Sequence, residues 1–149
     1  IPSQYLKKVN GQRNNSVQND KRPAVLFETD YIHLIDEKVN SCMQENQPYI
    51  QNKFNLAELA VMINIPIHHL AYFFREGKKQ SFTNYRNRWR VDHAKILIND
   101  GKAKEMTLEA IGLLSGFPNR NSFIIAFKRF EGISPHEYVS GSEIESPEA

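Results

Sequence analysis

Cysteine is nearly absent from this chain. Cys42 is the only one among 149 residues, which excludes an internal disulfide and any zinc site built from several thiolates. It lies beside Met43 in a helical pattern, where a cysteine ordinarily serves as a small buried apolar residue.

Long hydrophobic runs are also missing. No apolar stretch approaches the ~18 residues of a membrane span, and the opening residues IPSQYLKKVN lack the apolar segment of a secretion signal. These absences favour a cytoplasmic protein. The chain starts at Ile1 rather than Met, from which we expect it to be a piece of a longer protein.

Catalytic and metal-binding patterns are not found either. The five histidines form no H-E-x-x-H motif, and the adjacent His68 and His69 would point ~100° apart on a helix, which makes them poor joint ligands. There is no glycine-rich phosphate loop and no Ser/His/Asp signature. We therefore expect no catalytic residues, no metal, no cofactor and no enzymatic activity.

What is present suits a small globular protein. Apolar residues make up 40% and charged residues 24%, which is typical of a chain with a packed core, and the length allows one domain or two very small ones. Charge is uneven: residues 66–139 hold twelve basic and seven acidic side chains, and the last ten residues hold three acids. A polyanion site is therefore expected in the basic half.

Periodicity divides the chain into three parts. Residues 1–28 are polar and show no helical or strand period, so we predict a linker or disordered arm. Residues 29–139 are helical throughout, with no alternating pattern typical of strands. Residues 140–149 read as an acidic flexible tail.

Within 29–139 a helix-turn-helix pattern occurs twice, at about 55–75 and 107–130. Asn55 followed by Glu58 predicts a capped helix start, Thr107 predicts a second, and Asn119 or its neighbour opens a third helix. Ser81 caps a longer stretch, FTNYRNRWRVDHAKILIND. The expected fold is all-α, with about seven helices in two helix-turn-helix subdomains (29–80 and 103–139) joined by a linking helix over 82–100.

These motifs together resemble the DNA-binding domain of the AraC/XylS family of bacterial transcription regulators over residues 30–139. The first unit carries FNLAELAVMINIPIHHLAYFF and the second TLEAIGLLSGFPNRNSFIIAFKRFEGISPHEY. The chain departs from the family pattern at Lys79, where glycine is usual, at Arg86, and at Gly112 and Ser115. Those departures concern local packing.

The resemblance implies sequence-specific binding of promoter DNA by two recognition helices in successive major grooves. It places His68, Ala71, Tyr72 and Arg75 of the first unit, and Arg120, Asn121, Ser122 and Ile125 of the second, toward the DNA. Lys128 flanks the second set, and Arg86 or Arg88 is a candidate phosphate contact. By the same resemblance Arg90 braces the domain internally.

In the second unit the phenylalanines at 117, 123, 127 and 130 form the expected buried stripe, so Ile124 and Ile125 cannot both be buried with them. An outward isoleucine in a major groove can pack against thymine methyl groups. The alternative is that one of the two isoleucines packs against the other unit or an upstream domain.

The resemblance further implies partners beyond DNA: RNA polymerase, and an upstream sensor or dimerisation domain that binds a ligand or is embedded in a membrane. A helical module that binds only proteins remains the rival hypothesis. Salt-sensitive, sequence-preferring DNA binding distinguishes the two.

Overall fold

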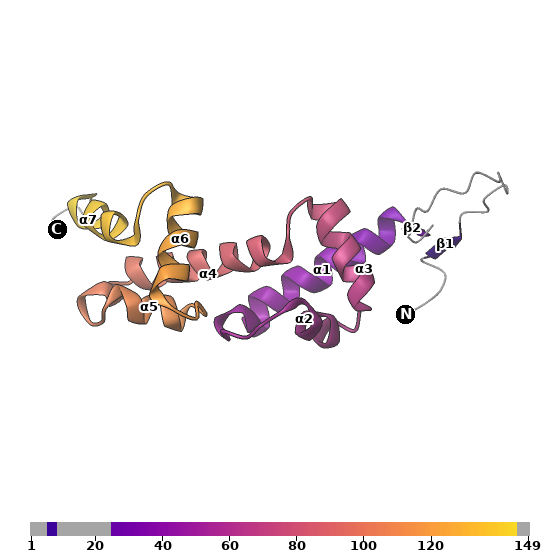
Figure 1. Ribbon diagram of the computed structural model, residues 1–149, viewed down its shortest axis with the longest axis horizontal. Helices are drawn as coiled ribbons and strands as arrows, with labels where there is room; N and C mark the ends of the chain where they lie inside the picture. The colour runs from indigo at the N-terminus through magenta and orange to yellow at the C-terminus, as the bar shows by residue number, and fades with distance from the viewer. Residues whose placement is uncertain (1–5, 9–24, 146–149) are drawn as a thin grey trace.

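The computed structural model describes the backbone of residues 6–8 and 25–145 and the side chains of 28–141. Figure 1 shows an elongated arrangement in which α4 runs along the long axis and joins two groups of helices. The elements are β1 Leu6–Lys8, β2 Val25–Phe27, α1 Thr29–Asn46, η2 Pro48–Ile50, α2 Leu56–Ile63, α3 Ile67–Tyr72, η3 Phe73–Lys78, α4 Phe82–Asn99, η4 Lys102–Lys104, α5 Leu108–Leu114, α6 Arg120–Glu131 and α7 Pro135–Glu145. The all-α prediction with two helix-turn-helix units is confirmed.

Four side-chain caps fix where the central helices begin. The side-chain oxygens of Asn55, Ser81, Thr107 and Asn119 each accept a hydrogen bond from the backbone N–H three residues later. Such bonds satisfy N–H groups that a helix start leaves unpaired. The helix starts predicted from these residues are therefore confirmed.

The apolar core is divided into two clusters, and α4 contributes to both. Tyr85 of α4 belongs to the cluster built by α1, α2, α3 and η3. Val91, Ala94 and Ile98 of α4 belong to the cluster built with α5 and α6. Each half of α4 is thus part of a different core, which ties the two units to one rigid helix.

Arg90 sits at the junction between the units. The residue is 1% exposed, and its guanidinium donates to the backbone carbonyls of Tyr49 (2.7 Å) and Gln51 (2.8 Å) in the first unit. It also lies over the ring of Phe117 in the second unit, 5.8 Å from the centroid. Burial, with a smaller contribution from the charge of Arg86, lowers the pKa of Arg90 to about 10, so it stays charged at neutral pH. The bracing role expected for Arg90 is confirmed.

The turn of the second unit closes this junction. Gly116 has φ +103°, and a Cβ built there would overlap the carbonyl oxygen of Tyr49 and lie 2.7 Å from Arg90 Nε. Beside it, Ser115 donates to the Ile111 carbonyl (2.8 Å), so the 3.1 Å pair with His93 uses the Nδ1 proton of that histidine. Burial lowers the pKa of His93, which suits a neutral ring in this place.

The structure shows the surroundings of two residues that depart from the family pattern. At Gly112 a Cβ would lie 2.6 Å from the ring of Phe123, so only glycine lets α6 approach α5 this closely. Lys79 has φ +52° and therefore occupies the left-handed conformation that glycine adopts most readily.

The segment Ile67–Lys78 differs from the sequence-based expectation at two residues. Its apolar pattern predicts Ile67, Leu70, Phe73 and Phe74 inward, His69 on the outer face and a helix end at Gly77. Ile67 is instead 47% exposed, and His69 is buried at 8%. The helix also continues past Gly77 as a π-type turn, η3, to Lys78. The core-facing residues are Leu70, Phe73 and Phe74, which agree with the prediction.

At the ends of the chain the structure adds two features. Strands β1 and β2 pair antiparallel, with Leu6 opposite Phe27, inside the segment that we predicted to be a linker or arm; the rest of 1–24 lies outside the described residues. Helix α7 reaches Glu145, beyond position 139, where we placed the end of the domain. Residues 146–149 of the predicted tail are outside the described part.

Among the described helices none is both long and apolar enough to span a bilayer by itself. Only α2 taken together with the segment Ile67–Lys78 meets the requirement of length and composition, and those two segments meet at an angle of 114°.

Candidate nucleic-acid interface

The orientation of α6 is set by its buried aromatic side chains. Phe123, Ala126 and Phe127 are at most 5% exposed, and Phe123 packs between the rings of Phe117 and Phe127, at 5.3 and 5.8 Å between centroids. At ~100° per residue, the face opposite this stripe holds Asn121, Ile125 and Lys128. All three are exposed.

The flanks of this face hold other predicted site residues. Arg120 is exposed at the first position of α6. Ser122 is half-buried, and its hydroxyl donates to the Asn119 carbonyl at 2.9 Å. The outward face of α6 therefore carries Asn121, Ile125 and Lys128, and its two opposite flanks carry Arg120 and Ser122.

The two isoleucines of α6 separate in the structure. Ile124 is half-buried and lines a groove with Leu108 and Pro135, whereas Ile125 is 69% exposed. Neither isoleucine belongs to the buried residues of the second core.

Helix α3 presents the corresponding face of the first unit. With Leu70, Phe73 and Phe74 inward, the opposite side carries His68, Ala71, Tyr72 and Arg75. Arg75 is 62% exposed; its Nε lies 3.2 Å from Glu76 Oε1, and its guanidinium lies 5.7 Å from the ring centroid of Tyr72. The four predicted residues are therefore on one side, although part of the positive charge of Arg75 is offset by its neighbour.

His69 holds α3 against α1. Its Nδ1 is 2.8 Å from the hydroxyl of Tyr31, and the two rings meet edge to face. Burial, and then the charge of neighbouring His68, lower the pKa of His69. A neutral, buried imidazole therefore acts as a packing residue, which sequence reasoning treated as surface.

The arginines of α4 are placed differently from the prediction that Arg86 or Arg88 contacts phosphate. Arg86 is half-buried and donates to the Phe54 carbonyl at 3.0 Å, and burial lowers its pKa. Arg88 pairs with Asp92 (3.5 Å) and Glu131 (3.7 Å) and lies over the ring of Phe130. Both side chains connect α4 to neighbouring elements, so the structure favours a bracing role for them.

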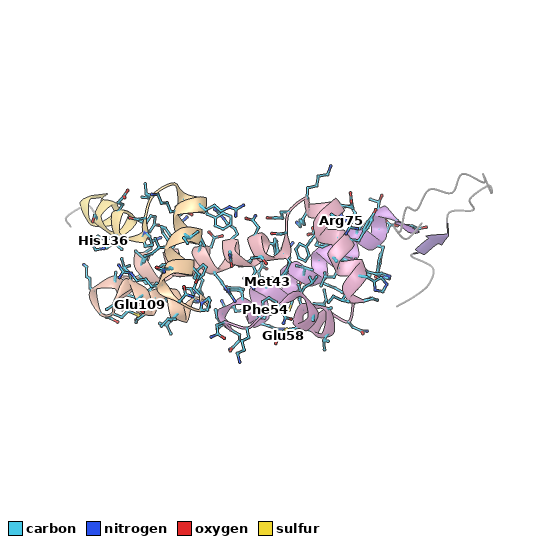
Figure 2. All side chains as sticks on the ribbon, in the orientation of Figure 1. Met43, Phe54, Glu58, Arg75, Glu109 and His136 are labelled. Atoms are coloured by element: carbon cyan, nitrogen blue, oxygen red, sulfur yellow. The ribbon has the colours of Figure 1, made fainter. Side chains whose placement is uncertain are left out.

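Grooves lie beside α3 and beside α6, and sequence reasoning missed both. One lies beside α6, between the N-terminal ends of α5 and α7. Two of its lining residues, Glu109 and His136, are labelled at the left of Figure 2. The other lies beside α3 and η3, between the N-terminal ends of α2 and α4, and contains Leu56, Arg75 and Ser81. The helix starts at Leu56, Phe82 and Leu108 are capped by side chains, and Glu58 and Glu109 lie in the first turns of α2 and α5.

The frame that carries α3 and α6 is continuous. Helix α4 has 18 residues, which at ~1.5 Å per residue makes it about 27 Å long. In Figure 1 α3 and α6 stand upright beside opposite ends of α4.

Among the described residues no cluster of three or more histidine, cysteine, aspartate or glutamate side chains could hold a metal ion.

Comparisons with known proteins agree with this geometry. A family model described as a helix-turn-helix domain matches residues 59–141. An uncharacterised HTH-type transcriptional regulator of Staphylococcus aureus is 30% identical over 105 residues, which is 70% of this chain and 14% of that protein. The arabinose operon regulatory protein of Salmonella typhimurium is 24% identical over 83% of this chain and 43% of its own length. The chain thus spans about a seventh of the length of the Staphylococcus aureus relative and less than half of the length of the Salmonella typhimurium relative.

Solved structures share the fold. A Listeria innocua protein of unknown function superposes with a TM-score of 0.60 at 25% identity, over 71% of this chain and 95% of that one. The C-terminal domain of the response regulator YesN of Fusobacterium nucleatum gives 0.55 at 23% identity, over 74% and 99%. The C-terminal domain of AraT of Geobacillus stearothermophilus gives 0.59 at 19%, over 72% and 84%.

Proposed function

Because the chain belongs to the AraC-type family of helix-turn-helix transcription regulators, we propose that it binds double-stranded promoter DNA sequence-specifically, with α3 and α6 in successive major grooves. The observation that supports this most is the pair of exposed, largely polar faces on α3 and α6, carried by one frame. A major groove admits one α-helix and displays a distinct pattern of polar and methyl groups for each base pair.

The proposal assigns base reading and phosphate binding to different residues. Base reading falls to the outward faces and first turns of α3 and α6, that is, to His68, Ala71, Tyr72, Arg75, Arg120, Asn121, Ser122 and Ile125. Lys128 lies one turn further along α6 and is suited to a phosphate. Arg86, which we first expected on phosphate, is assigned to bracing.

A rigid frame has a consequence for the DNA. Successive major grooves on one face of B-DNA are ~34 Å apart, whereas α4 is about 27 Å long. With Arg90 and Gly116 fixing the junction, the protein cannot stretch freely, so the duplex is expected to bend toward it. One chain would then read an asymmetric site.

Further partners belong to the full-length protein. The relatives are longer than this chain, and the response-regulator domain with the same fold is the C-terminal part of its protein. We propose that an upstream sensor or dimerisation domain and RNA polymerase are the protein partners.

A salt series tests the proposed function directly. Selection of bound sequences from random DNA, followed by gel shifts from 50 to 200 mM salt, is expected to give a preferred site whose affinity falls steeply, by about one counterion for each phosphate contacted. Failure to bind any DNA at low salt, together with retained binding to a protein partner, would favour the interaction module instead.

Arg120→Ala is expected to weaken binding to the selected site by about 1–3 kcal/mol and to relax the preference for one base pair, because an arginine at the start of a recognition helix can bond to guanine with two hydrogen bonds. Competition gel shifts against single-position variants of the site measure both effects.

Arg129→Ala is the matched control. It removes the same charge from the same helix at an exposed position nine residues later, about 180° around the axis. It should lower the affinity for all sequences equally or not at all. Identical base preferences for wild type and Arg120→Ala would refute base reading by Arg120.

A further inference from the structure

We propose that the half-site read by α6 contains a thymine recognised through its 5-methyl group by Ile125. This inference rests on the proposed DNA-binding function and specifies one base of the site.

The position of Ile125 supports direct contact with a ligand. Its side chain is 69% exposed and lies about 30° from the axis opposite the buried Phe123, Ala126 and Phe127 stripe. Ile124, the neighbouring isoleucine, turns instead toward the groove lined by Leu108 and Pro135. The outward face of α6 therefore exposes one branched aliphatic side chain near its centre.

The surroundings of Ile125 favour DNA over an apolar protein surface. Asn121 lies one turn before it, and Lys128 and Arg129 lie about one turn after it; all three are exposed. Among the described side chains, the other large apolar residues that are exposed are Val61, Met62, Ile67, Ile96, Leu113, Leu114 and Ile133, and none of these lies on α6. The cations and the amide suit the phosphates and base edges of DNA, and the single apolar side chain suits a small apolar group such as a thymine methyl.

Thymine is the standard base whose major-groove edge carries a methyl group. An isoleucine against the edges of cytosine, adenine or guanine would desolvate amino or carbonyl groups without replacing their hydrogen bonds. Ile125 is thus expected to favour thymine by attraction and to disfavour the other bases by unpaired polar groups.

Removal of single methyl groups from the DNA tests this inference. In the site selected by the 149-residue chain, each thymine of the α6 half-site is replaced in turn by deoxyuridine, which differs only by the lost methyl. At one position wild type should bind about fourfold more weakly, as expected for one buried methyl group. Competition gel shifts measure the ratio.

The same DNA series with protein variants identifies the contacting residue. Ile125→Ala should bind thymine and deoxyuridine equally at that position, because its short side chain no longer reaches the methyl. Ile125→Val, which keeps a branched side chain, should retain most of the discrimination. Thermal melts of both variants should match wild type, since the position is exposed.

The possible outcomes separate this inference from the function on which it rests. Deoxyuridine without effect at every thymine, or with equal effect on wild type and Ile125→Ala, would overturn the thymine contact while leaving DNA binding intact. If no sequence is bound preferentially, both proposals are wrong. Loss of discrimination in Ile125→Ala alone supports the contact.

Discussion

Replacing Gly116 by alanine is expected to lower the free energy of unfolding by about 2–6 kcal/mol. Two costs add. An alanine at φ +103° is strained by about 1–3 kcal/mol, and its Cβ would overlap the carbonyl oxygen of Tyr49 while crowding Arg90 Nε, a clash typically worth another 1–3 kcal/mol. The neighbour on one side is backbone, which cannot simply rotate away.

The chain offers a control that separates the two costs. Gly132 also has a positive φ, +78°, but a Cβ there meets nothing within 4 Å. Gly132→Ala should therefore show only the conformational cost, about 1–2 kcal/mol. Urea unfolding monitored by circular dichroism gives both values. Equal losses for the two variants would mean that Gly116 does not hold the units together by close approach.

Gly116→Ala should also change DNA binding in a way that a purely local defect would not. If the clash separates the two units, the variant should tolerate a one-base-pair insertion between the half-sites better than wild type does. The physical reason is that the contacts between Tyr49, Arg90 and Gly116 hold the second unit to the first; without them α4 alone sets the distance. Unchanged sensitivity to spacing would assign the rigidity to α4.

Phe127→Ala is the other large effect, with an expected loss of about 3–5 kcal/mol of stability. Phe127 is fully buried, and its ring lies 5.8 Å from that of Phe123 and 5.4 Å from that of Tyr138. Truncation removes the contact between α6 and α7 and leaves a cavity that helices fixed by α4 cannot easily close. Thermal and urea melts measure the loss.

Ile125→Ala serves as the matched control on the same helix. It also removes an apolar side chain, but one that is mostly exposed to solvent. The free energy of unfolding should therefore stay within about 0.5 kcal/mol of the wild-type value. Should Phe127→Ala melt like wild type, the buried stripe would be misassigned, and the outward direction of Asn121, Ile125 and Lys128 would be wrong with it.

The residues that sequence reasoning placed well are those whose structure depends on near neighbours. Asn55, Ser81, Thr107 and Asn119 act within three residues of themselves, so the helix starts could be identified from the chain alone. The long stripe of α6 repeats over three turns, which fixes its inward face without ambiguity.

What sequence reasoning missed concerns short or crowded segments. In α3 the period is too brief to decide between Ile67 and His69, and the outcome depends on Tyr31, 38 positions earlier in the chain, which binds His69. The hydrogen bond from Arg86 to the loop carbonyl of Phe54 joins residues 32 positions apart. Neither of these contacts can be predicted from the residues near it in the sequence.

By itself the sequence determined the helices, their caps and the side of α6 that turns outward, because hydrogen bonds and apolar periodicity act within one or two turns. Only the tertiary structure decided how the two units are held, through the meeting of Tyr49, Arg90 and Gly116, and where grooves open beside α3 and α6. Such features arise where residues far apart in the chain, such as Tyr49 and Gly116, come into contact, and the free energy of each contact depends on both partners at once.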